Sequence, residues 1–313
     1  FIYFSIVENK FWYFLLPVFS LFFFNFFFKY YKNKVGLPSE IKNHFDKIKI
    51  DILILPTTLF DCETIFFEKL CLKYKCKSVI LVNNWDNLSS KGIYWFKPNL
   101  IGVWSEQARN HALNIHSFNE NSIKIIGSPI YDNYFKLRKS SLKNYFSKNY
   151  ILFTGCNLPF DELNVLKILD KIIIKNNLTI SIVYRPHPLR FERYSDDNFE
   201  AHKFKNIIMD PQVKLYRSNL VSKQLPDLKY YPSLLKNAKF VISPLSTMVV
   251  ESIIFYKPIL LILHNDDYHF TNPKRNMKYF EHLKILKDFK FIFKSNEKTD
   301  LENIFLEMLS GKN

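Results

Sequence analysis

The chain has 313 residues, of which 48% are hydrophobic and 23% are charged. This length and composition exclude a peptide-sized module and a chain that is disordered throughout, and they fit one large α/β domain or two of ordinary size. The formal net charge of +15 would suit a nucleic-acid-binding protein, but the lysines are spread along the whole chain and only seven of the 44 basic residues are arginine, so a basic binding module is kept only as a non-enzymatic alternative.

Residues 11–28 form a nearly continuous apolar run, FWYFLLPVFSLFFFNFFF, which is followed by Lys29 and Lys32. A helix of this length reaches the threshold for crossing a bilayer, and the basic flank suits a cytoplasmic interface. A spanning helix, an interfacial helix and an ordinary core helix remain open for this run. We treat residues 1–35 as a separate segment and predict a cytoplasmic protein that associates with the inner face of the plasma membrane through residues 11–32. Because the sequence starts at Phe1, we expect a fragment or a processed chain.

Strands and helices alternate from residue 51 onward. The predicted strands of this region are 51–58, 77–84, 99–104 and 122–126. Its predicted helices are 62–75 and 105–115, the second capped by Ser105. Continuous apolar strands of this kind are typical of a parallel sheet that is covered on both faces. We predict an N-terminal α/β domain over residues 36–133, incomplete at its start, and a polar, basic linker over residues 134–150.

A second series of strands and helices begins at residue 151. The predicted strands are 151–155, 178–188, 206–209, 240–243 and 258–263. The predicted helices are 161–176, 231–236, 246–256 and 300–309. Residues 189–230 are largely irregular, which predicts a long functional loop. The series indicates a C-terminal α/β domain over residues 151–313, so the predicted fold class is α/β with two Rossmann-like domains and a cleft between them.

Several common active-site motifs do not occur in the sequence. The six glycines form no Walker A or G-x-G-x-x-G loop, and there is no H-E-x-x-H, G-x-S-x-G or D-x-D motif. Kinases, P-loop enzymes and standard dinucleotide enzymes are therefore disfavoured. The four cysteines form no C-x-x-C pair, which predicts reduced thiols. We predict no metal site and no resident cofactor, and we interpret Asp196, Asp197, Asp266 and Asp267 as solvated loop charges.

A polar loop ends the predicted strand at 178–188. Arg185 and His187 lie there between prolines that stiffen the backbone, at the carboxyl end of a strand, where open α/β sheets bind ligands. An arginine offers a two-pronged fork to phosphate, and this lysine-rich chain has arginine here. We predict that Arg185 and His187 bind a phosphate or pyrophosphate. The alternative is a rigid turn with exposed polar residues.

A second strand end carries the sequence Ser243-Pro244-Leu245-Ser246-Thr247. The free N–H groups and the dipole of a helix that begins here would attract an anion, and the hydroxyls would add donors. Glu251 lies one helical turn after Thr247, where a carboxylate accepts hydrogen bonds from ribose hydroxyls. We predict an anion and ribose site. The alternative is an ordinary helix cap with a surface glutamate.

The segment 83–92, NNWDNLSSKG, contains a tryptophan among amides, a carboxylate, hydroxyls and a lysine. This combination is typical of a sugar or polyol pocket, in which a ring stacks on the sugar and polar groups bind its hydroxyls. Asparagine and aspartate also favour plain turns, which is the alternative. The residues predicted to form the pocket, and to bind the acceptor, are Trp85, Asn87, Ser90 and Lys91.

The chain resembles capsule and surface-polysaccharide glycosyltransferases of the GT-B type over about residues 50–265. The similarity rests on the segments NNWDNLSSKG, VWSEQARNHALNIHSFNENSIKIIGSPIYD, YRPHP and LLKNAKFVISPLSTMVVESIIFYKPILLI. The chain also resembles the CDP-glycerol glycerophosphotransferases and, more distantly, the non-hydrolysing UDP-N-acetylglucosamine 2-epimerases.

The resemblance implies two Rossmann-like domains, of which the second binds the nucleotide of an activated donor and the first binds the acceptor. Arg185 and His187 match the R-x-H-P donor loop of these enzymes, and Ser246, Thr247 and Glu251 match their S-T-x-x-x-E phosphate and ribose segment. The chain departs from the pattern at its amino end, where the first strand and its glycine-bearing loop are not recognisable. The acceptor contacts of these enzymes are therefore not carried over.

We expect a glycosyltransferase that moves a sugar from a nucleotide-activated donor, its substrate, to a surface-polysaccharide or lipid-linked acceptor without a tightly bound metal. In enzymes of this type helix dipoles and basic side chains stabilise the leaving diphosphate. The acceptor hydroxyl needs a base, for which Asp86 is the first candidate, followed by Glu63 and Glu106. Phosphoalcohol transfer from a CDP-activated polyol and 2-epimerisation of a UDP-sugar are the enzymatic alternatives.

Overall fold

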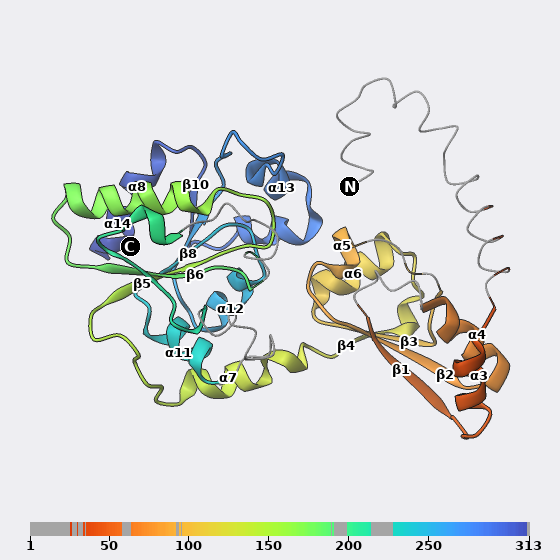
Figure 1. Cartoon of the computed structure of the whole chain (residues 1–313). Helices are drawn as coiled ribbons and strands as arrows, with labels where there is room; N and C mark the ends of the chain where they lie inside the picture. Colours follow the sequence, from red (N-terminus) through yellow and green to blue (C-terminus); the bar gives the residue numbers. More distant parts are fainter. Residues whose placement is uncertain are drawn as a thin grey trace, which may run out of the picture. The chain divides into compact units, whose positions relative to one another are not determined.

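The computed structural model describes residues 26, 30, 34, 36–57, 64–91, 94, 96–188, 190, 199–213 and 228–311. The chain divides into two compact units, Phe1–Gly127 and Ser128–Asn313 (Figure 1). Each unit is built around one parallel sheet, which has four strands in the first unit and six in the second. The predicted α/β class with two Rossmann-like domains is confirmed.

The first unit has the strand order β1-β2-β3-β4, and all neighbouring strands are parallel. Its strands are Ile52–Thr57 (β1), Lys77–Val82 (β2), Leu100–Val103 (β3) and Ile123–Ile125 (β4). Its helices are Ser39–Phe45 (α3), Thr64–Tyr74 (α4), Asn87–Ser90 (α5) and Glu106–Asn114 (α6), with a 3-10 turn (η2) at Glu120–Ser122. Ser105 caps α6 as predicted, because its hydroxyl accepts from the N–H of Ala108 at 3.3 Å.

The core of the first unit packs α5 and α6 against the sheet. Ile80 of β2 and Ile101 of β3 are fully buried there with Leu88 of α5 and Ala112 of α6. Because parallel strands in chain order end at one edge of their sheet, the loops after β2 and β3 leave it together. Residues 83–91 therefore lie at the same edge as the start of α6.

The second unit has the strand order β10-β9-β8-β5-β6-β7, again with parallel neighbours. Its strands are Tyr150–Thr154 (β5), Ser181–Arg185 (β6), Ile207–Met209 (β7), Val241–Ser243 (β8), Ile259–Ile262 (β9) and Ile292–Ser295 (β10). Its helices are Asp132–Lys139 (α7), Glu162–Lys175 (α8), Tyr230–Asn237 (α11), Met248–Ile254 (α12), Pro273–Tyr279 (α13) and Asp300–Ser310 (α14), with 3-10 segments at Pro129–Tyr131 (η3), Phe199–His202 (η4) and Glu281–Lys287 (η5). The strand order reverses between β5 and β8, and open α/β sheets bind ligands at such a point.

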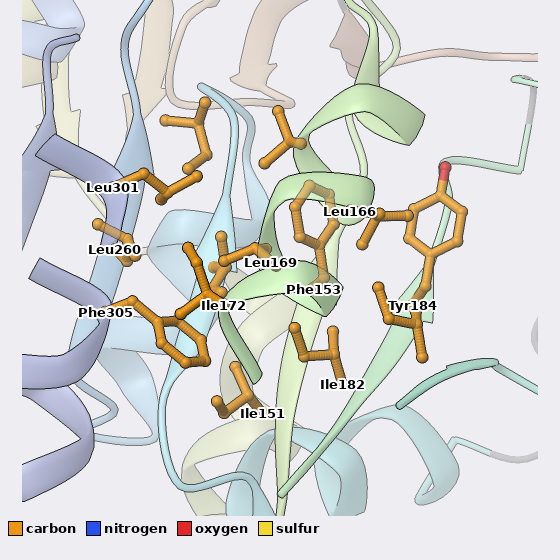
Figure 2. Close-up of a cluster of buried hydrophobic side chains, with 14 of the residues drawn as sticks. Ile151, Phe153, Leu166, Leu169, Ile172, Ile182, Tyr184, Leu260, Leu301 and Phe305 are labelled. Carbon is orange, nitrogen blue, oxygen red and sulfur yellow. The ribbon is translucent and has the colours of Figure 1, made fainter. Parts of the chain in front are cut away.

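Figure 2 shows the main core of the second unit, which lies on one face of the sheet. Phe153 of β5 and Tyr184 of β6 are buried there with apolar residues of α8 and α14. On α8 the buried residues recur three or four positions apart, the spacing of one helix face. Because successive side chains of a strand alternate between its faces, Thr154 and Arg185 lie on the opposite face. That face carries the candidate site.

Some elements differ from the sequence prediction. Residues 134–150, the predicted linker, begin inside α7, which is held to the second unit because Arg138 donates to the carbonyl of Ile254 at 3.1 Å. The many lysines of this segment mask its buried Leu137. Helix α12 spans Met248–Ile254 and is shorter than the predicted 246–256. The short elements β10 and α13 have no counterpart among the predicted ones, because lysines interrupt their apolar patterns.

The sequence predicts a membrane segment near the amino end of the chain. Within the described ranges, no helix combines the length and the apolar character that crossing a bilayer requires. The predicted membrane segment, residues 11–32, falls outside those ranges except for Phe26 and Tyr30. Membrane association through this segment stays a prediction.

Candidate functional site

Three polar side chains lie side by side where the central strands of the second unit end. Thr154 ends β5, Arg185 ends β6 and Ser243 ends β8. The register pairs Thr154 with Arg185, and it pairs Phe153 with Ile242, which sets Thr154 beside Ser243. All three are buried, at 8% exposure for Arg185, 1% for Thr154 and 0% for Ser243. We call these three residues the polar row, and it lies where the strand order reverses. Because side chains alternate along a strand, the polar row lies on the face opposite the core residues Phe153 and Tyr184.

Arg185 shares its charge with a buried carboxylate. Its Nη1 donates to the carboxylate of Asp210 and to Oε1 of Gln212, the latter at 3.1 Å. Asp210 is fully buried and also accepts from the Tyr230 hydroxyl at 2.7 Å. The guanidinium carbon of Arg185 lies 4.9 Å from the ring centroid of Tyr231. The side chain predicted to bind phosphate is thus already balanced by a carboxylate that no sequence motif indicates, and its contact with a phosphate stays a proposal.

Glu251 of α12 belongs to the same group of side chains. The Tyr134 hydroxyl of α7 donates to Glu251 Oε2 at 3.3 Å, and the charge of Arg185 acts on the carboxyl. Burial raises the pKa of Glu251 from its ordinary value of 4.5 to about 7, against the opposing effects of Tyr134, Arg185 and Tyr231. Glu251 is half-buried, so the alternative of a surface glutamate is wrong. A carboxyl that titrates near neutral pH can both donate to and accept from a hydroxyl.

The raised pKa of Glu251 predicts a stability that depends on pH. Between pH 4.5 and about 7 the folded chain keeps a proton that the unfolded chain has released, so the free energy of unfolding falls as the pH rises through this window. A shift of this size corresponds to about 3 kcal/mol. Glu251→Gln cannot ionise, so it should gain up to about 3 kcal/mol over wild type between pH 5 and pH 8. Urea unfolding of both proteins at these pH values checks this, and a constant difference between them would contradict it.

A glycine allows two loops of the site to approach each other. Gly155 follows Thr154, and a Cβ on it would lie 2.6 Å from Glu162 Oε2, 2.9 Å from Pro186 Cα and 3.0 Å from the His187 nitrogen. Any other residue would push apart the loops that follow β5 and β6. Gly155 therefore helps to place His187, the second predicted phosphate ligand, which is half-buried on the loop after β6.

A buried ion pair holds the loop that carries His187. Glu162 begins α8, is fully buried, and accepts from the Tyr184 hydroxyl at 2.6 Å. Arg190 follows the loop after β6 and pairs with Glu162 at 3.2 Å. Neither residue belongs to a motif, because the two partners are far apart in the sequence. The ion pair between Glu162 and Arg190 therefore anchors the loop after β6 that carries His187.

Ser246 and Thr247 lie just before α12 and not in its first turn. The hydroxyl of Ser246 is 3.2 Å from that of Ser243, which joins it to the polar row. Thr247 occupies the cap position of α12, but its side chain makes no capping hydrogen bond. Both residues are half-buried at the carboxyl edge of β8. The predicted donor-binding residues of this segment, Ser243, Ser246, Thr247 and Glu251, therefore gather at one end of the sheet together with Arg185.

Asp266 is not the solvated charge that the sequence suggests. Its side chain is only 2% exposed, and it accepts from the N–H groups of Asp161, Tyr268 and His269 at 2.7, 3.0 and 2.9 Å. Burial alone would raise the pKa of Asp266, but the hydrogen bonds from His269 and the backbone outweigh it and hold this pKa below its ordinary value. Asp266 ties the loop after β9 to the start of α8. Its neighbour Asp267 is exposed, as predicted.

The predicted acceptor loop follows β2 in the first unit. Asp86 precedes α5, and its Oδ2 lies 3.2 Å from Nζ of Lys91 and 3.5 Å from the Ser90 hydroxyl. Its Oδ1 is enclosed and has no hydrogen-bond partner among the described residues. Asn87 is buried and accepts from the N–H of Asn84, which shapes the loop. The loop therefore presents a carboxylate next to an ammonium and a hydroxyl.

Two tryptophans border this loop. Trp85 is half-buried beside Asp86, and Trp104 at the end of β3 donates from Nε1 to the carbonyl of Val82 at 2.9 Å. Sequence reasoning did not single out Trp104, although its place directly after a buried strand is the signal that would have indicated it. Two aromatic side chains, Trp85 and Trp104, therefore lie at the sheet edge of the predicted sugar pocket.

The other two candidate bases are placed differently. Glu63 lies outside the described residues. Glu106 begins α6, exposes 70% of its side chain and pairs with Arg109 at 3.4 Å. Its carboxylate already has a partner on the surface of the helix, whereas Asp86 keeps an unused oxygen.

Metal-binding chemistry has no counterpart in the described part of the chain. No group of three or more histidine, cysteine, aspartate or glutamate side chains is gathered there in a way that would hold a metal ion. The described cysteines, Cys71, Cys76 and Cys156, form no disulfide with one another.

Comparison with known proteins bears on the fold. No family profile matches the chain, and no curated protein matches it. Among solved structures, a glycosyltransferase from Rickettsia africae ESF-5 has 12% identity and a TM-score of 0.50, with 87% of this chain and 70% of that chain covered. A structure described as the glycotransferase of kitacinnamycin has 9% identity, a TM-score of 0.50 and the same coverages. A UDP-GlcNAc 2-epimerase from Methanocaldococcus jannaschii has 16% identity and a TM-score of 0.49, with 87% and 80% covered.

At these identities the likeness establishes the fold alone. The chain has the two-domain GT-B architecture, with parallel sheets of four and six strands. The resemblance inferred from the sequence is thus supported at the level of the fold and not at that of a particular family.

Proposed function

We propose that the chain is a glycosyltransferase that takes a sugar from a nucleotide-activated donor and transfers it to a surface-polysaccharide or lipid-linked acceptor. The observation that carries the proposal is the polar row with Glu251. Four residues singled out in the sequence, Arg185, Ser243, Ser246 and Glu251, come together at the point of strand reversal of a fold that glycosyltransferases also have.

In the proposed donor site, different residues bind the diphosphate and the ribose of the nucleotide. His187, Ser246 and Thr247 lie at loop level, where backbone N–H groups, hydroxyls and an imidazole suit a diphosphate. Glu251 of α12, on whose carboxyl the charge of Arg185 acts, suits the hydroxyls of a ribose. The charge of Arg185, shared with Asp210, orders this part of the sheet edge.

The proposed reaction needs one proton transfer. The acceptor hydroxyl oxygen forms a bond to the anomeric carbon of the sugar, and the bond from that carbon to the diphosphate oxygen breaks. The acceptor proton passes to Asp86, whose Oδ1 is enclosed without a partner among the described residues. The Nζ of Lys91 lies 3.2 Å from Oδ2 of the same carboxylate. The departing nucleoside diphosphate carries the electron pair of the broken bond.

Binding of nucleotides is the first test. A ligand at about a hundred times its Kd adds about 2.7 kcal/mol to stability, which in a unit of this size corresponds to a rise in Tm of about 5–10 °C. We expect such a rise with at least one of UDP, CDP and GDP, or with a corresponding nucleotide-sugar. Inorganic pyrophosphate at matched ionic strength is the control for charge alone. No response to any nucleotide would contradict the proposal, and product analysis with a labelled donor separates sugar transfer from phosphoalcohol transfer and 2-epimerisation.

A further inference from the structure

Thr154 has a hydroxyl whose hydrogen-bonding capacity the described residues do not use. The residue is 1% exposed, and its Oγ1 is enclosed without a hydrogen-bond partner among them. The neighbouring Ser243 differs, because its hydroxyl donates to the carbonyl of Pro244 at 2.7 Å and approaches Ser246 at 3.2 Å. Arg185, on the other side, is paired with Asp210. Thr154 is thus the member of the polar row that is left to bind something else.

Packing alone does not require this hydroxyl. Thr154 stands at the end of a strand whose other residues are Tyr150, Ile151, Leu152 and Phe153, all buried. Valine has nearly the same shape as threonine and carries no polar atom, so it would fill the position without leaving a hydroxyl unsatisfied. The buried hydroxyl therefore destabilises the chain without ligand. A bound ligand that formed a hydrogen bond with it would remove this destabilisation.

The surroundings of Thr154 favour a hydroxyl over a phosphate. The one arginine beside it is balanced by Asp210, and Glu251 adds a second carboxyl to the same face. A diphosphate placed here would meet no uncompensated positive charge from these groups. A hydroxyl can both donate and accept, as Thr154 itself can.

The loops that follow β5 and β9 also favour a hydroxyl over a phosphate. The Oδ1 atoms of Asn157, after β5, and Asn265, after β9, are also enclosed without a partner among the described residues. These are acceptors, so they call for a ligand that brings donors. The two loops are joined, because Asp161 donates its N–H to Asp266 at 2.7 Å. Ring hydroxyls supply such donors, whereas phosphate oxygens do not.

We propose that the Thr154 hydroxyl binds a ring hydroxyl of the ligand, either of its ribose or of the sugar that the nucleotide carries. This inference rests on the proposed function, since it assigns the uncharged part of the same ligand. Thr154 is a binding residue. Its hydroxyl favours ligands that carry the ring hydroxyl over ligands that lack it, and Thr154→Val removes this contact.

The stability of the free chain tests the premise. Thr154→Val should keep or raise the Tm of the protein without ligand, because the variant removes an unsatisfied hydroxyl at nearly constant volume. A lower Tm would mean that the hydroxyl has a partner within the protein, and it would overturn the proposal. Thr154→Ser keeps the hydroxyl and is the matched control for binding.

Ligands that differ by one group test the assignment. Dissociation constants are measured for UDP, 2′-deoxy-UDP, 3′-deoxy-UDP and UDP-N-acetylglucosamine, or for the cytidine or guanosine series if that base gives the larger thermal shift. Thr154→Val should weaken binding at least about fivefold where the hydroxyl contact is made, and Thr154→Ser should not. Loss confined to the nucleotide-sugar assigns the transferred sugar. Loss for UDP that is absent for one deoxy form assigns the ribose.

The remaining outcomes overturn the proposal. An equal loss for all four compounds places the contact on the phosphates or the base, and unchanged binding by Thr154→Val removes the contact altogether. In both cases wild-type binding still supports the proposed function. A wild-type chain that binds none of the compounds overturns the proposed function, and this inference with it.

Discussion

Asp210→Ala is expected to lower the free energy of unfolding of the second unit by about 3–5 kcal/mol, because it leaves Arg185 buried without its carboxylate partner. Asp210 is fully buried, the Arg185 side chain is 9% exposed, and the carboxylate also holds the Tyr230 hydroxyl at 2.7 Å. A loss of this size is a large part of the 5–15 kcal/mol that stabilises an ordinary domain. The variant should therefore unfold at a much lower urea concentration than wild type.

The measurement can separate the two units. All four tryptophans, at positions 12, 85, 95 and 104, lie in Phe1–Gly127, so tryptophan fluorescence reports on the first unit. Far-UV circular dichroism reports on both units. In Asp210→Ala we expect the circular dichroism signal of the second unit to be lost at a lower urea concentration, while the unfolding transition seen by tryptophan fluorescence stays as in wild type. Asp267→Ala, which removes the exposed partner of Lys298 at 2.8 Å, is the matched control, with an expected effect within about 1 kcal/mol. An Asp210→Ala variant as stable as this control would contradict the role given to the buried pair.

Asp86→Asn is expected to slow sugar transfer by about 10²–10⁴-fold, because it replaces the proposed base by an amide that takes up no proton. The substitution keeps the size of the side chain and removes the negative charge beside Lys91. Donor binding is proposed for the second unit, so the thermal shift with nucleotide should stay as in wild type. The rate is followed as release of nucleoside diphosphate from the best-binding nucleotide-sugar, with a cell-envelope extract as the source of acceptor.

Two further variants test the other candidate bases. Glu106→Gln changes a carboxylate that is 70% exposed and paired with Arg109, and it should leave the rate unchanged. Glu63→Gln tests the third candidate. Full transfer activity in Asp86→Asn, together with a loss in either of the other variants, would move the base to that residue.

The positions of the strands, and the sheet edge at which they end, could be predicted from the sequence. Continuous apolar runs such as 151–155 and 240–243 predict buried strands, and parallel strands end at one edge of a sheet. That reasoning brings Arg185 and Ser243 to the same edge without any coordinates, and the register of β5 with β6 and β8 agrees with it. The cap of α6 at Ser105 was predictable for a related reason, since the hydroxyl and the N–H that it accepts from are three residues apart.

Partners that are distant in the sequence were decided by tertiary structure. Asp266 reads as a solvated charge because its own segment is polar, yet its carboxylate is enclosed by the start of α8. Asp210 carries no motif, and only the pairing of β6 with β7 brings it to Arg185. Residues 134–150 read as a linker because the segment is polar and basic, yet Leu137 of α7 is buried and Arg138 donates to the carbonyl of Ile254.

The sequence by itself determined the periodicity of each element, and with it the fold class and the sheet edge that carries the candidate site. Those features depend on neighbouring residues, whose apolar spacing and capping groups act over a few positions. Which hydroxyl at that edge is left without a partner depends instead on every side chain that packs around it. Thr154 shows the difference: its place at the end of β5 follows from the run ILFTG, whereas its unused hydroxyl appears only once Arg185 and Ser243 have found their own partners in three dimensions.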